Sequence, residues 1–127
     1  MKRLDILNDS DLLDIEKHFP VKVLFNGLYV EEFLDTVENY LSEGHGFGAE
    51  YGACVFPDDL DEYDIATGGM FEGVDFGLHN GVEVLLDYKT FYYYLQKVCI
   101  GYCKDFPAHQ EAIENALRKF RLRFLSD

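Results

Sequence analysis

Tryptophan is absent from this 127-residue sequence, cysteine occurs only three times, and long apolar runs are missing. Three cysteines are too few, and odd in number, for the disulfide framework of a small secreted protein. A membrane helix needs about 18 or more apolar residues in a row. The N-terminus has two bases but lacks the apolar stretch and cleavage site of a signal peptide. We therefore expect a cytoplasmic protein with free thiols and no membrane partner.

Basic residues are missing from the middle of the chain. Between Leu24 and Tyr88 there are 15 acidic residues and no lysine or arginine, whereas the remainder has 11 bases and nine acids. The middle therefore has a formal charge of −15 and the remainder +2, which together give the net charge of −13. Such a segment repels nucleic acid and anionic membranes and attracts a basic partner. An acidic surface can also serve solubility alone, but solubility would not require one half of the chain to lose its lysines.

Composition and order of local signals predict the fold class. Hydrophobic residues make up 48% of the chain, enough for one domain, residues 1–127, to bury its own core. Helical spacing marks both ends, whereas nine of the 11 glycines lie between Gly44 and Gly81 and indicate strands and loops. This order predicts an α+β fold: a mainly antiparallel sheet with a central hairpin, packed against N-terminal and C-terminal helices.

Capping and turn residues predict the individual elements. Asp9 or Ser10 can cap a helix that ends near His18, because Pro20 breaks it. Further helices are expected over residues 28–43, over 88–104 behind the cap Asp87, and from Pro107 onward, with strands over 21–25 and 53–56. Asn80-Gly81 suits a type I′ turn, so residues 70–78 and 82–86 should pair as a hairpin. The second hairpin strand is nearly continuously apolar, which is typical of an interior strand.

No motif points to catalysis, a cofactor or a metal. The four histidines are isolated and lack ligand spacing. In the segment 58–64, Asp59 and Asp61 fit the first and third positions of an EF-hand loop, but Tyr63 and Asp64 do not fit the fifth and sixth. We expect a protein without enzymatic activity, cofactor or metal. The alternative is a small hydrolase that uses carboxylates and a divalent metal, which metal-dependent activity on a substrate panel would support.

Two groups of acidic residues are candidates for a binding surface. The first is an acidic loop with an aromatic centre, followed by two acids on the next strand: Asp58, Asp59, Asp61, Glu62, Tyr63, Asp64, Glu72 and Asp75. The second is the solvated face of the helix expected over 28–43: Glu31, Glu32, Asp35 and Glu38. We prefer the loop, because interfaces combine aromatic anchors with charge and only the loop offers both.

Part of the sequence resembles a known family. The resemblance lies in Phe71-Glu72-Gly73-Val74-Asp75-Phe76-Gly77-Leu78, in Glu83-Val84, in Phe91-Tyr92-Tyr93-Tyr94-Leu95, in residues 99–102, and in Pro107 at the start of a last helix. Over about residues 71–120 the chain resembles the immunity proteins of bacterial contact-dependent growth inhibition (CDI) systems, most closely the ribonuclease toxin immunity proteins of the CdiI family. These motifs are hydrophobic and glycine positions and include no active-site residues.

The resemblance implies a cytosolic antidote. Its partner would be a basic nuclease toxin, the C-terminal domain of a CdiA-type surface protein delivered by a neighbouring cell. The antidote would bind this toxin and block cleavage of RNA, often tRNA, without touching nucleic acid itself. The charge pattern agrees, since a nuclease presents cations to phosphates. The alternative is an acidic binding module or nucleic-acid mimic that acts on another basic protein; an adjacent toxin gene would distinguish the two.

Overall fold

The computed structural model describes residues 2–125. In this part of the chain, five α-helices accompany a four-stranded antiparallel sheet with the order β1-β2-β3-β4. The helices are α1 (Phe19–Asn26), α2 (Val30–Asn39), α3 (Glu62–Ala66), α4 (Tyr88–Asp105) and α5 (Gln110–Phe124). The strands are β1 (Phe47–Ala49), β2 (Gly52–Val55), β3 (Val74–Leu78) and β4 (Glu83–Leu86). The predicted α+β class with helices flanking the sheet is confirmed.

The N-terminal elements differ from the prediction. The helix expected up to His18 is only the 3-10 turn Asp9–Asp11, and the strand expected over 21–25 is helix α1. Pro20 does not break a helix but lies in the first turn of α1, where its missing N–H is not needed. Val21, Leu24 and Phe25 are fully buried at helical spacing. A run of five residues fits either period, and packing selected the helix.

Helices α2, α4 and α5 follow the predicted pattern. Helix α2 is shorter than expected and passes into the 3-10 turn Leu41–Glu43, which ends at Gly44 with a φ of +82°. The carboxylate of Asp87 accepts the N–H of Thr90 at 2.7 Å and so caps α4 as predicted. Pro107 opens the 3-10 turn Pro107–His109, and α5 continues from it.

The hairpin forms, with two corrections. Strands β3 and β4 pair antiparallel, but the loop is not a type I′ turn. Of the two central residues only Gly81 has a positive φ, +93°. Gly81 N–H donates to Leu78 O, and Leu78 N–H donates to Val82 O, which describes a three-residue loop with a glycine bulge. In addition, β4 is an edge strand and not an interior one. Its alternation explains this, since Leu86 is buried whereas Leu85 is 51% exposed.

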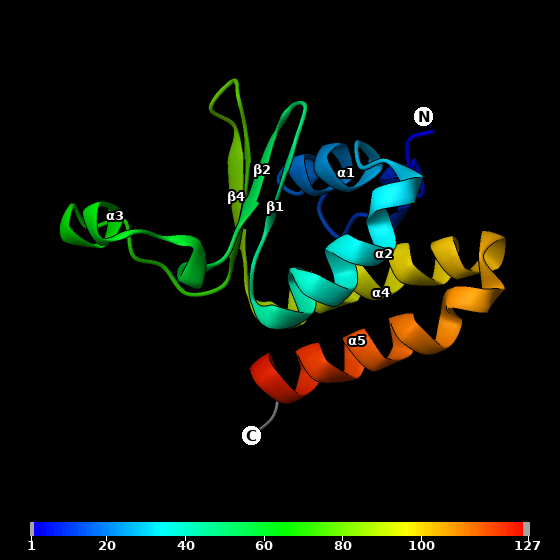
Figure 1. The fold of residues 1–127 in the computed structure, drawn as a ribbon. Helices are drawn as coiled ribbons and strands as arrows, with labels where there is room; N and C mark the ends of the chain where they lie inside the picture. The colour runs from blue at the N-terminus through cyan, green and yellow to red at the C-terminus, as the bar shows by residue number, and fades with distance from the viewer. Residues whose placement is uncertain (1, 126–127) are drawn as a thin grey trace.

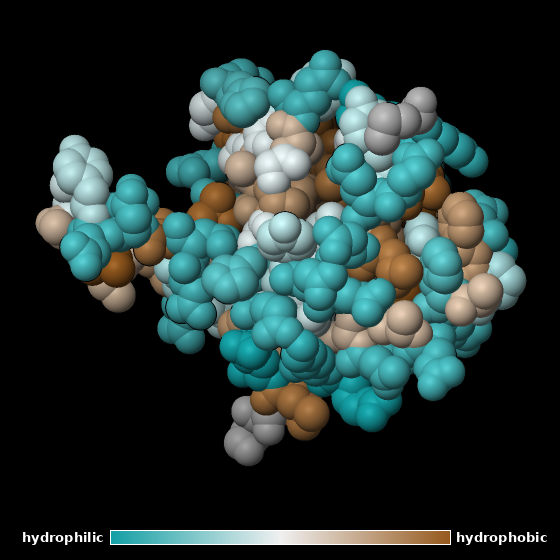
Figure 2. Space-filling model, viewed as in Figure 1, coloured by the Kyte–Doolittle hydropathy of each residue, from teal (hydrophilic) through white to brown (hydrophobic). Residues whose placement is uncertain are grey.

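The helices gather on one side of the sheet. Phe25 of α1, Phe76 of β3 and Phe91 of α4 pack with ring centroids 5.7 to 6.2 Å apart and link both helices to that face. The other face carries the cross-strand neighbours Val55, Asp75 and Leu85, all partly exposed. Figure 1 shows α3 on this second side, at the end of a projection formed by residues 57–72, here called the arm. The space-filling view shows the arm standing off the body (Figure 2).

None of the helices between residues 2 and 125 has both the length and the apolar character that crossing a membrane requires.

Candidate functional site

The base of the arm is anchored by Asp59. Its carboxylate accepts the backbone N–H groups of Gly46 and Phe56, both at 2.8 Å, and lies 3.0 Å from Nδ1 of His45. Gly46 also packs directly on the backbone of β2, because a Cβ there would lie 1.7 Å from the carbonyl oxygen of Cys54. Asp59 therefore fixes the arm to the loop before β1. The sequence did not reveal this structural role, because Asp59 lies within a run of acidic residues.

The rest of the predicted acidic loop contains a short helix. The carboxylate of Asp61 accepts the N–H of Asp64 at 2.8 Å, and that of Asp64 accepts the N–H of Asp61 at 3.3 Å. This reciprocal capping satisfies N–H groups that the first turn of a helix leaves free, and so begins α3. Backbone N–H groups thus fix the positions of Asp61 and Asp64, which would repel each other in an extended loop.

The tip of the arm exposes apolar side chains beside its acids. Tyr63 is 74% exposed, Ile65 48% and Met70 69%, and no residue of α3 is buried. The carboxylates of Asp58, Glu62 and Glu72 belong to exposed residues. Large apolar side chains gathered on a protruding element are typical of a binding surface.

A hollow of about 600 Å³ lies between the arm and the uncovered face of the sheet. We call it the acidic hollow; its walls are Val55, Asp59, Leu60, Asp64, Gly69, Phe71, Asp75, Glu83 and Leu85. It brings together three of the predicted site residues, Asp59, Asp64 and Asp75. The other five belong to the arm but do not line the hollow: Asp58, Asp61, Glu62, Tyr63 and Glu72.

Sequence reasoning missed Glu83 and Leu85 as site residues. The register places Leu85 opposite Asp75, and Glu83 opposite Gly77, so both project on the same face as Asp75. The predicted turn gave no such signal, because a two-residue type I′ turn at Asn80-Gly81 would pair Gly77 with Val84 and place Glu83 and Leu85 on the face opposite to Asp75. The observed three-residue loop shifts the register by one residue and brings both to the hollow.

Asp75 is the carboxyl group of the hollow with the most perturbed environment. Partial burial, followed by repulsion from Glu83 and a hydrogen bond with it, raises the pKa of Asp75 from 3.8 to about 6. Within residues 2–125 no lysine or arginine forms an ion pair with a carboxylate of the hollow; the one pairing there is His45 with Asp59. The hollow is therefore a partly desolvated anionic site that a cation from outside would stabilise.

The same carboxylates do not form a metal centre. Among residues 2–125, no three or more histidine, cysteine, aspartate or glutamate side chains are arranged to hold a metal ion. The thiols of α4 also lack the properties of nucleophiles, because burial raises the pKa of both Cys99 and Cys103.

The second predicted group lies elsewhere. Glu31, Glu32 and Asp35 are exposed on α2 and Glu38 is half-buried, with Asp35 accepting a hydrogen bond from the Asn39 amide at 2.6 Å. Helix α2 belongs to the helical side of the molecule, well separated from α3 (Figure 1). The structure thus divides the predicted acids between two surfaces. Glu32 lines a hollow of about 670 Å³ together with Glu50, which pairs with Arg3, whereas no carboxylate of the acidic hollow pairs with a lysine or arginine of residues 2–125.

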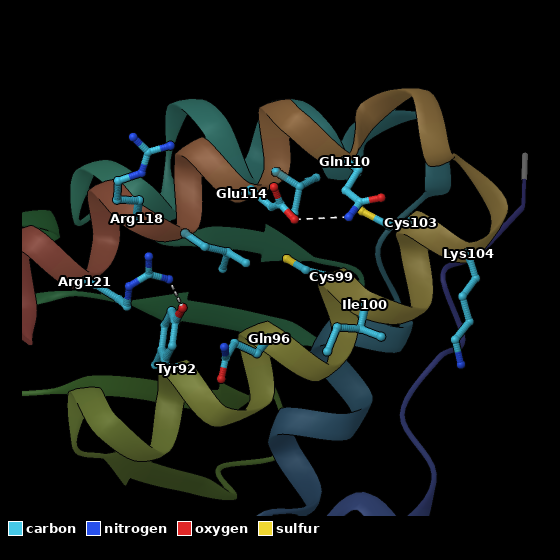
Figure 3. Close-up of a pocket in the computed structure, with 12 residues that line it drawn as sticks. Tyr92, Gln96, Cys99, Ile100, Cys103, Lys104, Gln110, Glu114, Arg118 and Arg121 are labelled. Atoms are coloured by element: carbon cyan, nitrogen blue, oxygen red, sulfur yellow. Dashed lines mark hydrogen bonds between the residues drawn. The ribbon is translucent and has the colours of Figure 1, made fainter.

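A groove of about 640 Å³ between α4 and α5 has a different character (Figure 3). Its lining comprises Tyr92, Gln96, Cys99, Ile100, Cys103, Lys104, Gln110, Ile113, Glu114, Leu117, Arg118 and Arg121. Arg121 donates a hydrogen bond to the hydroxyl of Tyr92, and Gln110 donates to Glu114 at 3.1 Å. We call it the α4–α5 groove. It combines an apolar floor with three cationic side chains.

The fold and its arm define an acidic α+β protein with a protruding, partly apolar element. Comparison with known families gives this class a name, because residues 17–117 match the CDI immunity protein family. The match extends from before α1 into α5 and so covers far more than the motifs after Phe71. The chain therefore belongs to the CDI immunity protein family. No curated protein gives a significant match to it.

Proposed function

We propose that this protein neutralises a cationic ribonuclease toxin of its own CDI system by binding it through the arm and the acidic hollow. Membership of the immunity family supports a toxin as the partner. The observation that carries the proposal is the half-buried Asp75 beside Glu83, in a hollow where no lysine or arginine of residues 2–125 forms an ion pair with a carboxylate.

The chemistry of the hollow fits a lysine or arginine side chain. Val55, Leu60 and Leu85 offer apolar walls to a long aliphatic stem. The charged head would then reach Asp75 and Glu83, where it replaces repulsion with attraction. A ribonuclease supplies such side chains, because its substrate groove must attract phosphates. Occupying them with carboxylates would deny the RNA its contacts.

The arm tip adds the apolar part of the proposed interface. Tyr63 of α3 is 74% exposed, and Ile65 on the same short helix is 48% exposed. Tyrosine is enriched among the residues that contribute most to binding energy. A basic partner would be guided by the negative field of the middle of the chain and then anchored by these side chains.

The test is a titration of the cognate nuclease. Adding the purified protein should abolish RNA cleavage near one equivalent. The association rate should fall as salt rises, since the Debye length shortens from about 30 Å at about 0.01 M to about 8 Å at about 0.15 M. Cleavage that continues at saturating protein would contradict inhibition by binding, and an association rate indifferent to salt would exclude electrostatic attraction.

A matched pair of variants locates the interface. One variant neutralises the hollow (Asp75→Asn with Glu83→Gln), and the other neutralises the helix face (Glu31→Gln with Glu32→Gln). Each removes two negative charges, so any loss caused by net charge alone is equal in both. We expect only the hollow variant to lose affinity by tenfold or more. The reverse result would move the site to α2.

A further inference from the structure

The α4–α5 groove is where several bases of the chain remain without an acidic partner. Of the 11 lysines and arginines, five form ion pairs: Arg3, Lys22, Lys97, Lys119 and Arg123. Lys104, Arg118 and Arg121 form no ion pair with a carboxylate of residues 2–125, and all three line the groove. Arg118 donates instead to the amide oxygen of Asn115. The groove therefore keeps positive charge in a protein of net charge −13.

The groove also offers apolar contact. Cys99, Ile113 and Leu117 form a buried floor, and Ile100 on one wall is 60% exposed. Glu114 is the single acid of the lining, and Gln110 donates a hydrogen bond to it. An occupant must therefore carry acids for the rim together with apolar side chains for the floor. An exposed segment that carries acids and apolar side chains close together satisfies both requirements.

The tip of the arm, around α3, is such a segment. Glu62 and Asp61 supply acids, and Tyr63 and Ile65 supply exposed apolar surface. The arm projects from the side of the sheet opposite the helical layer, so α3 stands far from the molecule's own α4 and α5 (Figure 1). One molecule cannot fill its own groove with its own arm, but the projection leaves α3 free to enter the groove of another molecule.

We propose that the arm of one copy docks in the α4–α5 groove of a second copy, which gives a head-to-tail self-association of the protein. The arm and the groove are different surfaces, so an assembly always has one free arm and one free groove at its ends. Further copies can therefore add to the assembly. Repulsion between highly acidic bodies opposes growth, and the contact area of one short helix is small. We therefore expect a weak interaction, with a Kd on the order of 100 µM.

One consequence rests on the proposed function. If the toxin also binds the arm, toxin and groove compete for the same side chains. Toxin binding should then release the self-associated protein as single copies, each in a toxin complex. At protein concentrations near or above this Kd, self-association would cover part of the arm tips while toxin is absent, which would limit non-specific contacts of Tyr63 and Ile65.

Two complementary variants test the head-to-tail geometry. The arm variant carries Asp58→Asn, Glu62→Gln and Tyr63→Ala, and it leaves the structural carboxylates Asp59, Asp61 and Asp64 unchanged. The groove variant carries Lys104→Glu and Arg118→Glu and keeps Arg121, which bonds Tyr92. Folding of each is checked by circular dichroism and urea unfolding, because all the substituted residues are exposed.

Analytical ultracentrifugation over a concentration series up to the millimolar range measures the molar mass of the assemblies. The parent should show a mass that rises with concentration, whereas each variant alone should stay monomeric. A mixture of the two variants should stop at a heterodimer, since only one intact arm and one intact groove remain. A monomeric parent, or a mixture that stays monomeric, would overturn the proposal, as would association that survives in either variant.

The nuclease titration keeps the two proposals apart. Because the groove variant retains its arm and hollow, it should inhibit the nuclease as well as the parent does. Loss of inhibition in that variant would assign the groove to the toxin and overturn self-association through it. Conversely, a parent that self-associates but never inhibits a nuclease would overturn the proposed function alone.

Discussion

The body and the arm use their acidic residues in different ways. In the body, bases from the two ends of the chain neutralise acids of the middle: Arg3 pairs with Glu50, and both Lys119 and Arg123 pair with Glu43. In the arm, Asp59, Asp61 and Asp64 accept backbone N–H groups instead. Some acids of the body are thus balanced by bases of the same molecule, whereas no acid of the arm pairs with a lysine or arginine of residues 2–125.

Truncation in the core should have the largest effect on stability. Phe91 is fully buried and packs against Phe25, Phe56, Phe76 and Phe120. We expect Phe91→Ala to lower the free energy of unfolding by about 3 to 5 kcal/mol, because it leaves a cavity that the sheet and helices cannot fill. Urea unfolding measures this. Tyr63→Ala is the control from the arm and should change stability by no more than about 0.5 kcal/mol. Equal losses would mean that the arm is part of the core.

The second largest loss of stability is expected for Asp59, which anchors the arm. Asp59→Ala removes the acceptor of two backbone N–H groups, so we expect a loss of about 1 to 2 kcal/mol. The loss should be local: hydrogen exchange should speed up at the amides of Gly46 and Phe56 and stay unchanged in α4. Asp58→Ala, one residue away and exposed, is the matched control. If both variants exchange alike, the carboxylate of Asp59 does not hold the arm.

Toxin affinity should respond to the arm tip without a change in stability. We expect the combination Asp58→Asn, Glu62→Gln and Tyr63→Ala to weaken binding of the nuclease at least tenfold, or about 1.4 kcal/mol, because it removes two charges and the aromatic anchor. Isothermal titration calorimetry or biolayer interferometry measures the affinity. The comparison variant on α2, with Glu31→Gln, Glu32→Gln and Asp35→Asn, should bind like the parent. Unchanged affinity in the arm variant would restrict the interface to the hollow.

The smallest effect concerns the pH dependence of stability. Since the pKa of Asp75 is raised from 3.8 to about 6 in the folded state, this group stabilises the fold below its unfolded pKa and loses that contribution as pH rises through about 6. Asp75→Asn should therefore raise the free energy of unfolding at about pH 8 by about 1 kcal/mol, a value reduced by the partial exposure of the group. Near pH 4 the difference from the parent should disappear.

The variant Asp75→Asn should change both stability and inhibition of the nuclease. Asp75→Asn should make the protein more stable at neutral pH and, on the proposed function, a weaker inhibitor of the nuclease. Such opposite signs are typical of a residue kept for binding and not for folding. Urea unfolding at several pH values, together with the inhibition assay, checks both. If stability and inhibition fall together, Asp75 has a structural role that its environment does not explain.

Local signals determined much of the helical architecture. Asp87 ahead of an apolar stripe predicted α4, and Pro107 marked the approach to α5, because capping and helical spacing act within a few residues. The hairpin followed from Asn80-Gly81 for the same reason. The acidic middle of the chain also follows from composition alone, as does the expectation of a basic partner. The assignment of the binding surface to the acidic residues of the arm stays a prediction, which the paired variants of the arm and α2 test.

Tertiary structure decided what local signals could not. Residues 21–25 are apolar enough for a strand or a helix, and burial against the sheet made them α1. Asp59 became an anchor because the loop at Gly46, distant in sequence, presents its N–H there. Glu83 entered the acidic hollow through its register with β3, and the ends of the chain supplied bases to acids of the middle. Each of these depends on contacts between residues far apart along the chain, which composition and spacing do not encode.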